Sequence, residues 1–210
     1  MIEITSVGSL REDDKQQIEM LLASTFDDPK EALRYGFIRN DNAIVERTDE
    51  ISGFLLFNEE QIEVEESTLA IAYFGMIASC RNTGIRSSLR LIKAATDYLS
   101  EQGVRIGWGR TSNPLLLPLV SHCFSTVAPS AVGGYTDREE QIFLAIAKQL
   151  GQLPRKHAPY FLPSAAKHNY RLAELRRFQR HLKSKPYLQL FDKLGFDFSR
   201  GDRIAFVSTW

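Results

Sequence analysis

The part of the chain that most constrains its fold is a long apolar run followed by a polar loop and a helical pattern. Residues 68–79 are almost continuously apolar, which is typical of a strand buried on both faces. Residues 80–84 read as a loop, and from Ser87 apolar residues recur at helical spacing. Residues 104–108 form the next expected strand. This order predicts a βαβ-like unit in the middle of the chain.

Further strands and helices are expected on both sides of this unit. The strands expected from alternating or β-branched runs lie at residues 2–5, 43–46, 51–57, 196–198 and 203–208, with the last two forming a closing hairpin. The helices expected from apolar residues at helical spacing lie at residues 137–150, 165–185 and 187–194. For 165–185 the expected apolar stripe is Leu172, Leu175, Phe178 and Leu182. The pattern as a whole predicts an α/β (α+β) fold.

Composition limits the classes to which the chain can belong. With 26 basic and 26 acidic residues among 210, a strongly basic or strongly acidic protein is excluded. Cys80 and Cys123 are too few for a disulfide framework and indicate reduced thiols. The first residues lack a signal-peptide pattern, and no apolar run reaches the length of a membrane span. We therefore expect a cytoplasmic protein with no membrane contact, and we expect no metal site.

The segment Arg81-Asn82-Thr83-Gly84-Ile85-Arg86-Ser87 is the motif that carries chemistry. A helix that starts here exposes unpaired N–H groups and the positive end of its dipole, which together bind phosphate. Gly84 allows close approach of the backbone, Arg81 and Arg86 add charge, and Ser87 adds a hydroxyl. These residues alone fit an ordinary strand-to-helix turn equally well. Neither a Walker A loop nor a dinucleotide fingerprint is present.

Four segments in the same order resemble the GNAT superfamily of acyl-CoA-dependent N-acyltransferases. The loop at 81–86 is similar to the family's Gln/Arg-x-x-Gly-x-Gly/Ala motif except at Arg86. The other three segments are Ile51-Ser52-Gly53-Phe54, Arg110-Thr111-Ser112-Asn113-Pro114 and Leu190-Phe191-Asp192-Lys193-Leu194-Gly195-Phe196. The resemblance covers residues 1–113 and 186–210. It implies a GNAT-like mixed, mostly antiparallel sheet with flanking helices. It also implies a single domain, 1–210, with residues 114–185 as a mostly helical insertion before the last helix and hairpin.

The resemblance also implies a binding site for acetyl-CoA or another acyl-CoA as co-substrate. In this family the pantetheine arm pairs with the fourth strand, and an N–H near Met76 would polarise the thioester carbonyl. The residues implied to bind acyl-CoA are Phe74, Gly75, Met76, Arg81, Asn82, Thr83, Gly84, Ile85, Arg86, Ser87 and Asn113. Core packing is the favoured interpretation of the side chains of Phe74 and Met76, because the implied role belongs to the backbone.

The candidate catalytic groups in the sequence are two tyrosines. An amine must lose its proton before it attacks a thioester, so a general base is useful, but residues 68–79 contain no carboxylate. Tyr73 lies on this strand and is a candidate for orienting a water molecule. The family often uses a Tyr in its fourth helix as the acid, but Phe191 stands at the matching position. Tyr187, one helical turn earlier, is the candidate acid.

Charge is distributed unevenly along the chain. Residues 46–66 hold eight acids and one base, whereas residues 167–185 hold seven bases and one acid. A solvated helix face is the favoured interpretation of the basic segment, ahead of contact with nucleic acid. The insertion is expected to form a cap near the acceptor site. The candidate wall residues of that cap are Tyr135, His157, Tyr160 and Phe161.

The leading hypothesis is an N-acetyltransferase that transfers an acyl group from acetyl-CoA to a primary amine by direct attack, without a cysteine acyl-enzyme. The identity of the amine-bearing acceptor and the existence of a homodimer are left open. One alternative is a catalytically silent CoA-binding or regulatory module. The other is a module that binds a protein partner or nucleic acid through the basic helix at 167–185.

Overall fold

A computed structural model describes residues 1–80, 84–164, 170–181 and 186–210 of the chain. The chain divides into two compact units. Unit 1 comprises Met1–Glu59 and Ala72–Arg105, together with Tyr170 and Arg171. Unit 2 comprises Glu60–Ile71, Ile106–His168 and Leu172–Trp210, so far as these residues are described. Two long strands, β3 (Ile51–Val64) and β4 (Ser67–Ser79), therefore contribute to both units.

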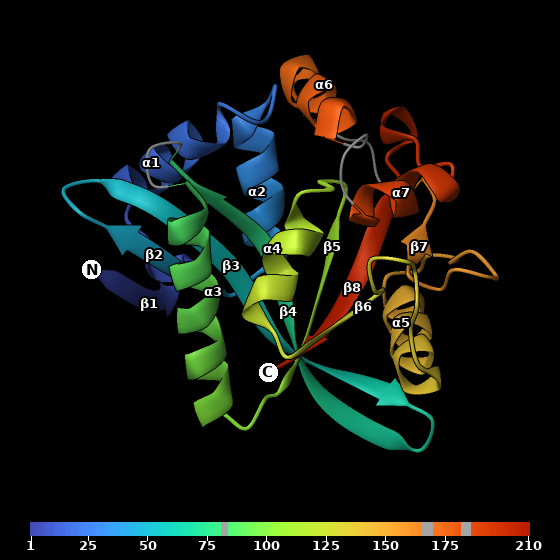
Figure 1. Cartoon of the computed structure of the whole chain (residues 1–210). Coiled ribbons are helices and arrows are strands. Elements are labelled where there is room, and N and C mark those ends of the chain that lie inside the picture. The colour runs from blue at the N-terminus through green and yellow to red at the C-terminus, as the bar shows by residue number, and fades with distance from the viewer. Residues whose placement is uncertain (81–83, 165–169, 182–185) are drawn as a thin grey trace. The chain divides into compact units, whose positions relative to one another are not determined.

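Unit 1 is an open sheet with helices on both faces (Figure 1). Its strands are β1 (Ile2–Ser6), β2 (Asn42–Arg47), the first part of β3 (Ile51–Val64) and the second part of β4 (Ser67–Ser79), in that order across the sheet. Its helices are η1 (Val7–Ser9), α1 (Glu12–Leu22), α2 (Pro29–Arg39) and α3 (Gly84–Glu101). β1 pairs with β2, and β2 with β3, in antiparallel register.

Alternation along β3 explains why helices cover both faces of unit 1. Phe54 and Leu56 are fully buried, and both belong to the apolar cluster that contains Ile18 of α1 and Leu33 of α2. Phe57 points to the other face, where its ring makes an edge contact with Tyr98 of α3. Since successive side chains of a strand point to opposite faces, one strand holds both helical layers.

Unit 2 contains the rest of the sheet and most of the insertion. Its order is the last part of β3, the first part of β4, then β5 (Ile106–Thr111), β8 (Arg203–Thr209) and β6 (Thr126–Ala128). β7 (Phe161–Leu162) also pairs with β8. Its helices are α4 (Leu116–Cys123), α5 (Asp137–Gln149), α6 (Leu172–His181), α7 (Pro186–Lys193) and η2 (Phe198–Arg200). The mixed, mostly antiparallel sheet with flanking helices that the resemblance implies is confirmed.

The partners of β8 differ from the predicted closing hairpin. Residues 196–198 form no strand, and the segment before β8 is the 3-10 turn η2. β8 pairs with β5 along Ile106–Thr111, and the insertion supplies β6 and β7 as further antiparallel partners. The hairpin prediction is therefore wrong. The insertion is also more than a helical cap, because two of its segments extend the sheet.

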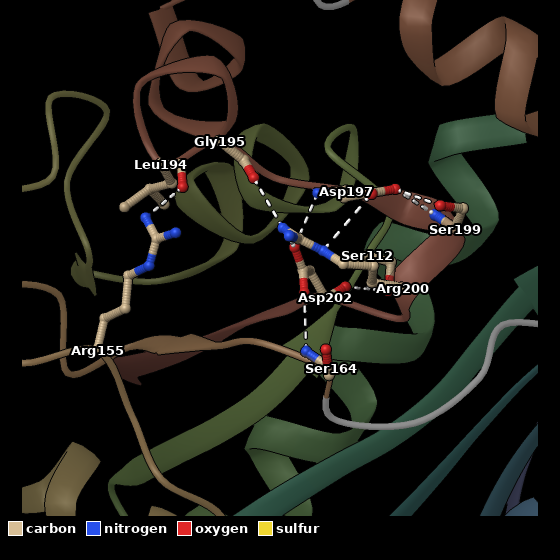
Figure 2. Close-up of polar contacts among 9 residues, drawn as sticks. All are labelled: Ser112, Arg155, Ser164, Leu194, Gly195, Asp197, Ser199, Arg200 and Asp202. Atoms are coloured by element: carbon tan, nitrogen blue, oxygen red, sulfur yellow. Dashed lines mark hydrogen bonds and ion pairs between the residues drawn. The ribbon is translucent and has the colours of Figure 1, made fainter.

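A buried aspartate holds the turn before β8 in place (Figure 2). Asp202 is fully buried, and its carboxylate accepts hydrogen bonds from the backbone N–H groups of Ser164 and Asp197, each at 2.8 Å. Arg200 donates to the same carboxylate at 3.0 Å, and Ser112 donates to the Asp202 carbonyl at 3.1 Å. The carboxylate of Asp202 thus joins the insertion to the last turn before β8, and its backbone carbonyl joins both to the end of β5.

The helix predicted at 165–185 is described only in part. Residues 165–169 and 182–185, including Leu182, lie outside the described residues, and α6 covers Leu172–His181. Phe178 is buried as predicted, but Leu172 is 60% exposed and does not belong to the buried stripe. In the described part of the chain, no helix is both long and apolar enough to cross a membrane.

Candidate functional site

The start of α3 follows β4, as the βαβ pattern predicts. Helix α3 begins at Gly84, so its first turn contains Gly84, Ile85, Arg86 and Ser87. Ile85 is 57% exposed and Arg86 is also exposed. The N–H groups of a first helical turn have no intrahelical acceptor and therefore face outward toward any bound anion. Arg81, Asn82 and Thr83 lie outside the described residues.

The side chain of Ser87 is turned inward. Ser87 is fully buried, and its hydroxyl donates a short hydrogen bond to the carboxylate of Glu46 on β2. Arg90, one turn later on α3, donates from Nε to the other oxygen of Glu46 at 2.6 Å. This hydroxyl therefore fixes the first turn of α3 to the sheet. The hydroxyl of Ser87 is thus not turned toward a bound phosphate, and only its backbone N–H is left for that role.

Gly53 on β3 makes room for this contact. The nearest atoms to a Cβ built at residue 53 are the Ser87 hydroxyl, a Leu91 methyl group and the Ala78 carbonyl oxygen. Helix α3 consequently lies directly on the β3 backbone at this point. The glycine of the Ile51-Ser52-Gly53-Phe54 segment thus has a local packing role.

Burial changes along the second half of β4. Tyr73 and Phe74 are buried, at 7% and 9% exposure, whereas Gly75 and Met76 are only half-buried and so are the residues from there to Cys80. The backbone of this half-buried segment leads toward the start of α3. The predicted acyl-CoA residues Phe74, Gly75 and Met76 and the described part of the loop therefore lie on consecutive elements of unit 1.

Asn40, at the end of α2, lies against Gly75. A Cβ atom at residue 75 would clash with both polar atoms of the Asn40 amide, so only glycine fits here. Met76 also approaches this turn of α2, since its methyl carbon would be 3.6 Å from a Cβ at Gly36. Gly75 and Met76 thus both lie close to the C-terminal end of α2.

The predicted residues of unit 2 make local contacts. Asn113 accepts a hydrogen bond from Leu115 N–H through its side-chain oxygen at 3.0 Å, which shapes the turn into α4. Tyr187 on α7 is half-buried, and its hydroxyl shares a hydrogen bond of 2.7 Å with Ser121 on α4. Phe191 is 1% exposed and belongs to the core. Tyr187 therefore presents a hydroxyl that is already held in a defined position.

The two cysteines are both half-buried and unbridged. Burial raises the pKa of Cys123 from 9.0 to about 11, and its thiol donates to the Leu119 carbonyl at 3.3 Å. A thiol with this pKa is protonated at neutral pH and is a poor nucleophile. Cys123 is therefore a poor candidate for carrying an acyl group.

The four candidate wall residues of the cap differ in exposure. Tyr160 and Phe161 are buried at 3% and 0%, and burial, followed by the nearby Tyr135, raises the pKa of Tyr160. Tyr135 is half-buried and makes edge contacts with Phe143 and Tyr160. His157 is exposed. Tyr160 and Phe161 thus serve the core of unit 2, and their prediction as wall residues is wrong.

Three residues of this region were not found from the sequence as parts of a site: Asn40, Glu46 and Arg90. In the sequence Glu46 is one of eight acidic residues between positions 46 and 66, and no local pattern distinguishes it from the others. Asn40 follows a helical segment and precedes a strand, which is typical of a helix end. Only the tertiary contacts with Gly75 and Ser87 reveal what these side chains do.

No protein-family model and no curated protein sequence matches this chain. Among solved structures, the chain is similar to a transcriptional regulator from Bacillus halodurans, with 17% identity and a TM-score of 0.49 over 65% of this chain and 98% of that one. It is similar to an aminoglycoside acetyltransferase from an uncultured soil metagenomic sample, solved with sisomicin, with 18% identity and a TM-score of 0.47 over 65% and 94%. It is also similar to a GNAT family N-acetyltransferase from Escherichia coli, solved with CoA, with 19% identity and a TM-score of 0.43 over 56% and 65%.

Proposed function

We propose that the chain is an acyl-CoA-dependent N-acyltransferase that uses acetyl-CoA and transfers the acyl group to a primary amine by direct attack. One observation carries the proposal: a half-buried segment, Gly75–Cys80, leads to the start of a helix. The first turn of this helix is held against the sheet by the hydrogen bond from Ser87 to Glu46. The outer side of that turn keeps Ile85 and Arg86 exposed. A half-buried strand segment, a helix N-terminus and a cation suit a long amide-containing arm that ends in a diphosphate.

In this proposal the first turn of α3 binds the pyrophosphate of acyl-CoA. The N–H groups of residues 84–87 and the guanidinium of Arg86 supply the positive potential. The carboxylate of Glu46 lies nearby, but Arg90 neutralises it, so it does not oppose the anion. The pantetheine arm then extends along β4 toward Gly75 and Met76, where a backbone N–H polarises the thioester carbonyl.

The transfer step needs a neutral amine. Its nitrogen attacks the thioester carbon, a C–N bond forms and the C–S bond breaks. The nitrogen gives up one proton to water, and the CoA thiolate takes up one proton. Tyr187 is the proposed proton donor, a role that rests on its position in the resemblance and on its ordered hydroxyl. The high pKa of Cys123 supports direct attack over a thioester on the enzyme.

The test is an assay of CoA thiol release from acetyl-CoA with a panel of primary amines: a polyamine, an aminoglycoside and peptides with free N-termini or lysines. We expect amine-dependent thiol release by the wild type. We expect Tyr187→Phe to lower kcat with little change in the KM for acetyl-CoA, and Tyr98→Phe, a matched change on α3, to leave both unchanged. Saturable acetyl-CoA binding without turnover on any amine would instead indicate a catalytically silent CoA-binding module.

A further inference from the structure

Asn40 carries a buried polar atom that has no hydrogen-bond partner among the described residues. The residue is 3% exposed, and its Oδ1 atom is the one without a partner. The other amide atom, Nδ2, donates to the Gly36 carbonyl at 2.7 Å. A carbonyl oxygen accepts and never donates, so this bond fixes the amide orientation and leaves the oxygen as the unpaired atom.

The position of this oxygen connects it with the proposed acyl site. Asn40 lies against Gly75, four residues before Ser79 on β4. At the rise of a strand, four residues correspond to roughly 13 Å. An acyl-CoA whose pyrophosphate lies at the start of α3 therefore brings the thioester end of its pantetheine arm close to Gly75. The unpaired oxygen lies on the strand face beside that end.

Met76 provides a way for a ligand to reach the oxygen. Its side chain is half-buried and lies against Gly36, in the same last turn of α2 whose carbonyl holds Asn40. Methionine is unbranched and flexible, so it changes rotamer at little cost when a ligand enters. The charged neighbours of Asn40 in the chain, Arg39 and Asp41, are exposed, and β4 carries no charged side chain in this segment.

From these observations we infer that Asn40 Oδ1 accepts a hydrogen bond from the nitrogen of the acceptor amine and orients it toward the thioester. The inference rests on the proposed function and adds a substrate contact to it. A neutral amide oxygen suits this task better than a carboxylate. A carboxylate would stabilise the ammonium form and raise the pKa of the amine, which must be neutral to attack.

The first test compares steady-state kinetics of three proteins with the best amine of the panel. Asn40→Leu is expected to raise the KM for the amine about tenfold, the size of one lost hydrogen bond, without changing the KM for acetyl-CoA. Asn40→Asp is expected to move the rising limb of the kcat–pH profile to higher pH. A control is Asn58→Asp, whose amide is already paired with Asp41 N–H at 2.5 Å and the Arg39 carbonyl at 2.6 Å.

The second test does not need turnover. In 15N-labelled protein, n-butylamine is added and the Asn40 side-chain NH2 signals, identified by their loss in Asn40→Leu, are followed by NMR. A saturable shift that is absent from the Asn58 signals supports the inference even if no acyl transfer occurs, in which case only the proposed function fails. Active enzyme with no such shift and an unmoved pH profile overturns the inference and leaves Oδ1 with a buried water. An increase in the KM for acetyl-CoA alone overturns it in favour of a contact with the pantetheine arm.

Discussion

Gly53 on β3 and Ser87 on α3 lie so close together that a Cβ atom at residue 53 would come within 2.6 Å of the serine oxygen. The same Cβ atom would be 3.3 Å from the Ala78 carbonyl oxygen of β4. One missing methyl group therefore allows β3, β4 and α3 to meet at the start of the helix. The proposed diphosphate site depends on this contact, because it sets where the first turn of α3 lies.

Gly53→Ala tests this dependence. The added methyl group must push the first turn of α3 away, which we expect to cost about 1–3 kcal/mol of unfolding free energy and to weaken acetyl-CoA binding. Denaturant unfolding and calorimetric binding measure the two effects. Gly8→Ala is the control, since the nearest atom to a Cβ at that position is 4.0 Å away. Equal stability and affinity in both variants would show that α3 is not held by this contact.

Removal of Glu46 is expected to loosen the same turn in a different way. Glu46→Ala leaves the buried Ser87 hydroxyl without its acceptor and Arg90 without its ion pair, and the expected loss is about 1–3 kcal/mol. Glu46→Gln keeps an oxygen for Ser87 and should cost less. Lys93→Ala on the same helix removes only an exposed pair with Asp97 and should change stability by less than about 0.5 kcal/mol. Chemical denaturation measures all three, and a Glu46→Ala variant as stable as Lys93→Ala would contradict the assignment.

The lowered pKa of Asp14 predicts how the free energy of unfolding changes at acid pH. The hydrogen bond from Arg11, with a second from Arg47 at 2.9 Å, lowers the pKa of this buried carboxyl from 3.8 to about 2, although burial itself opposes the shift. Its contribution, about 2 kcal/mol, is therefore fully present above roughly pH 4 and is lost as the pH falls through 2. Asp14→Asn should flatten the stability curve between these two pH values. Asp97→Asn, at an exposed site, should not, and a wild-type curve that is already flat there would contradict the pairing.

Cys123 gives a direct check on the route of the acyl group. Because burial raises its pKa to about 11, the thiol is protonated at neutral pH and should not take up an acetyl group. Intact-protein mass spectrometry after mixing with acetyl-CoA alone should show no added acetyl on this residue. Cys123→Ala should retain wild-type transfer. An acetyl adduct on the wild type that disappears in Cys123→Ala would establish an acyl-enzyme route instead.

The local elements of this chain could be predicted because their signals are local. The apolar spacing from Ser87 to Leu99 is enough to predict α3, and the continuous apolar run from residue 68 is enough to predict β4. The partners of β8 were not predictable in this way. The insertion supplies β6 and β7 through backbone pairing, and short strands such as Phe161–Leu162 carry no periodicity of their own.

The site was predictable only in outline for a related reason. The residue types at 81–87 predict the start of a helix, but the direction in which the Ser87 side chain points depends on Glu46, which is 41 positions away. The same holds for Asn40, because its role follows from its position against Gly75 on β4. Contacts between distant segments are set by tertiary packing, and no local spacing records them.

Calorimetric titration with acetyl-CoA is the decisive test of the proposed acyl-CoA site at the start of α3, next to β4. Gly84→Asp puts a carboxylate at the first residue of α3, where it suits the helix dipole but repels a diphosphate, so the fold should persist while binding is lost. Gln102→Asp, just beyond the opposite end of the helix, is the control. We expect saturable binding by the wild type and by Gln102→Asp, and none by Gly84→Asp. No binding of acetyl-CoA by the wild type, or undiminished binding by Gly84→Asp, would rule out a diphosphate site at the start of α3.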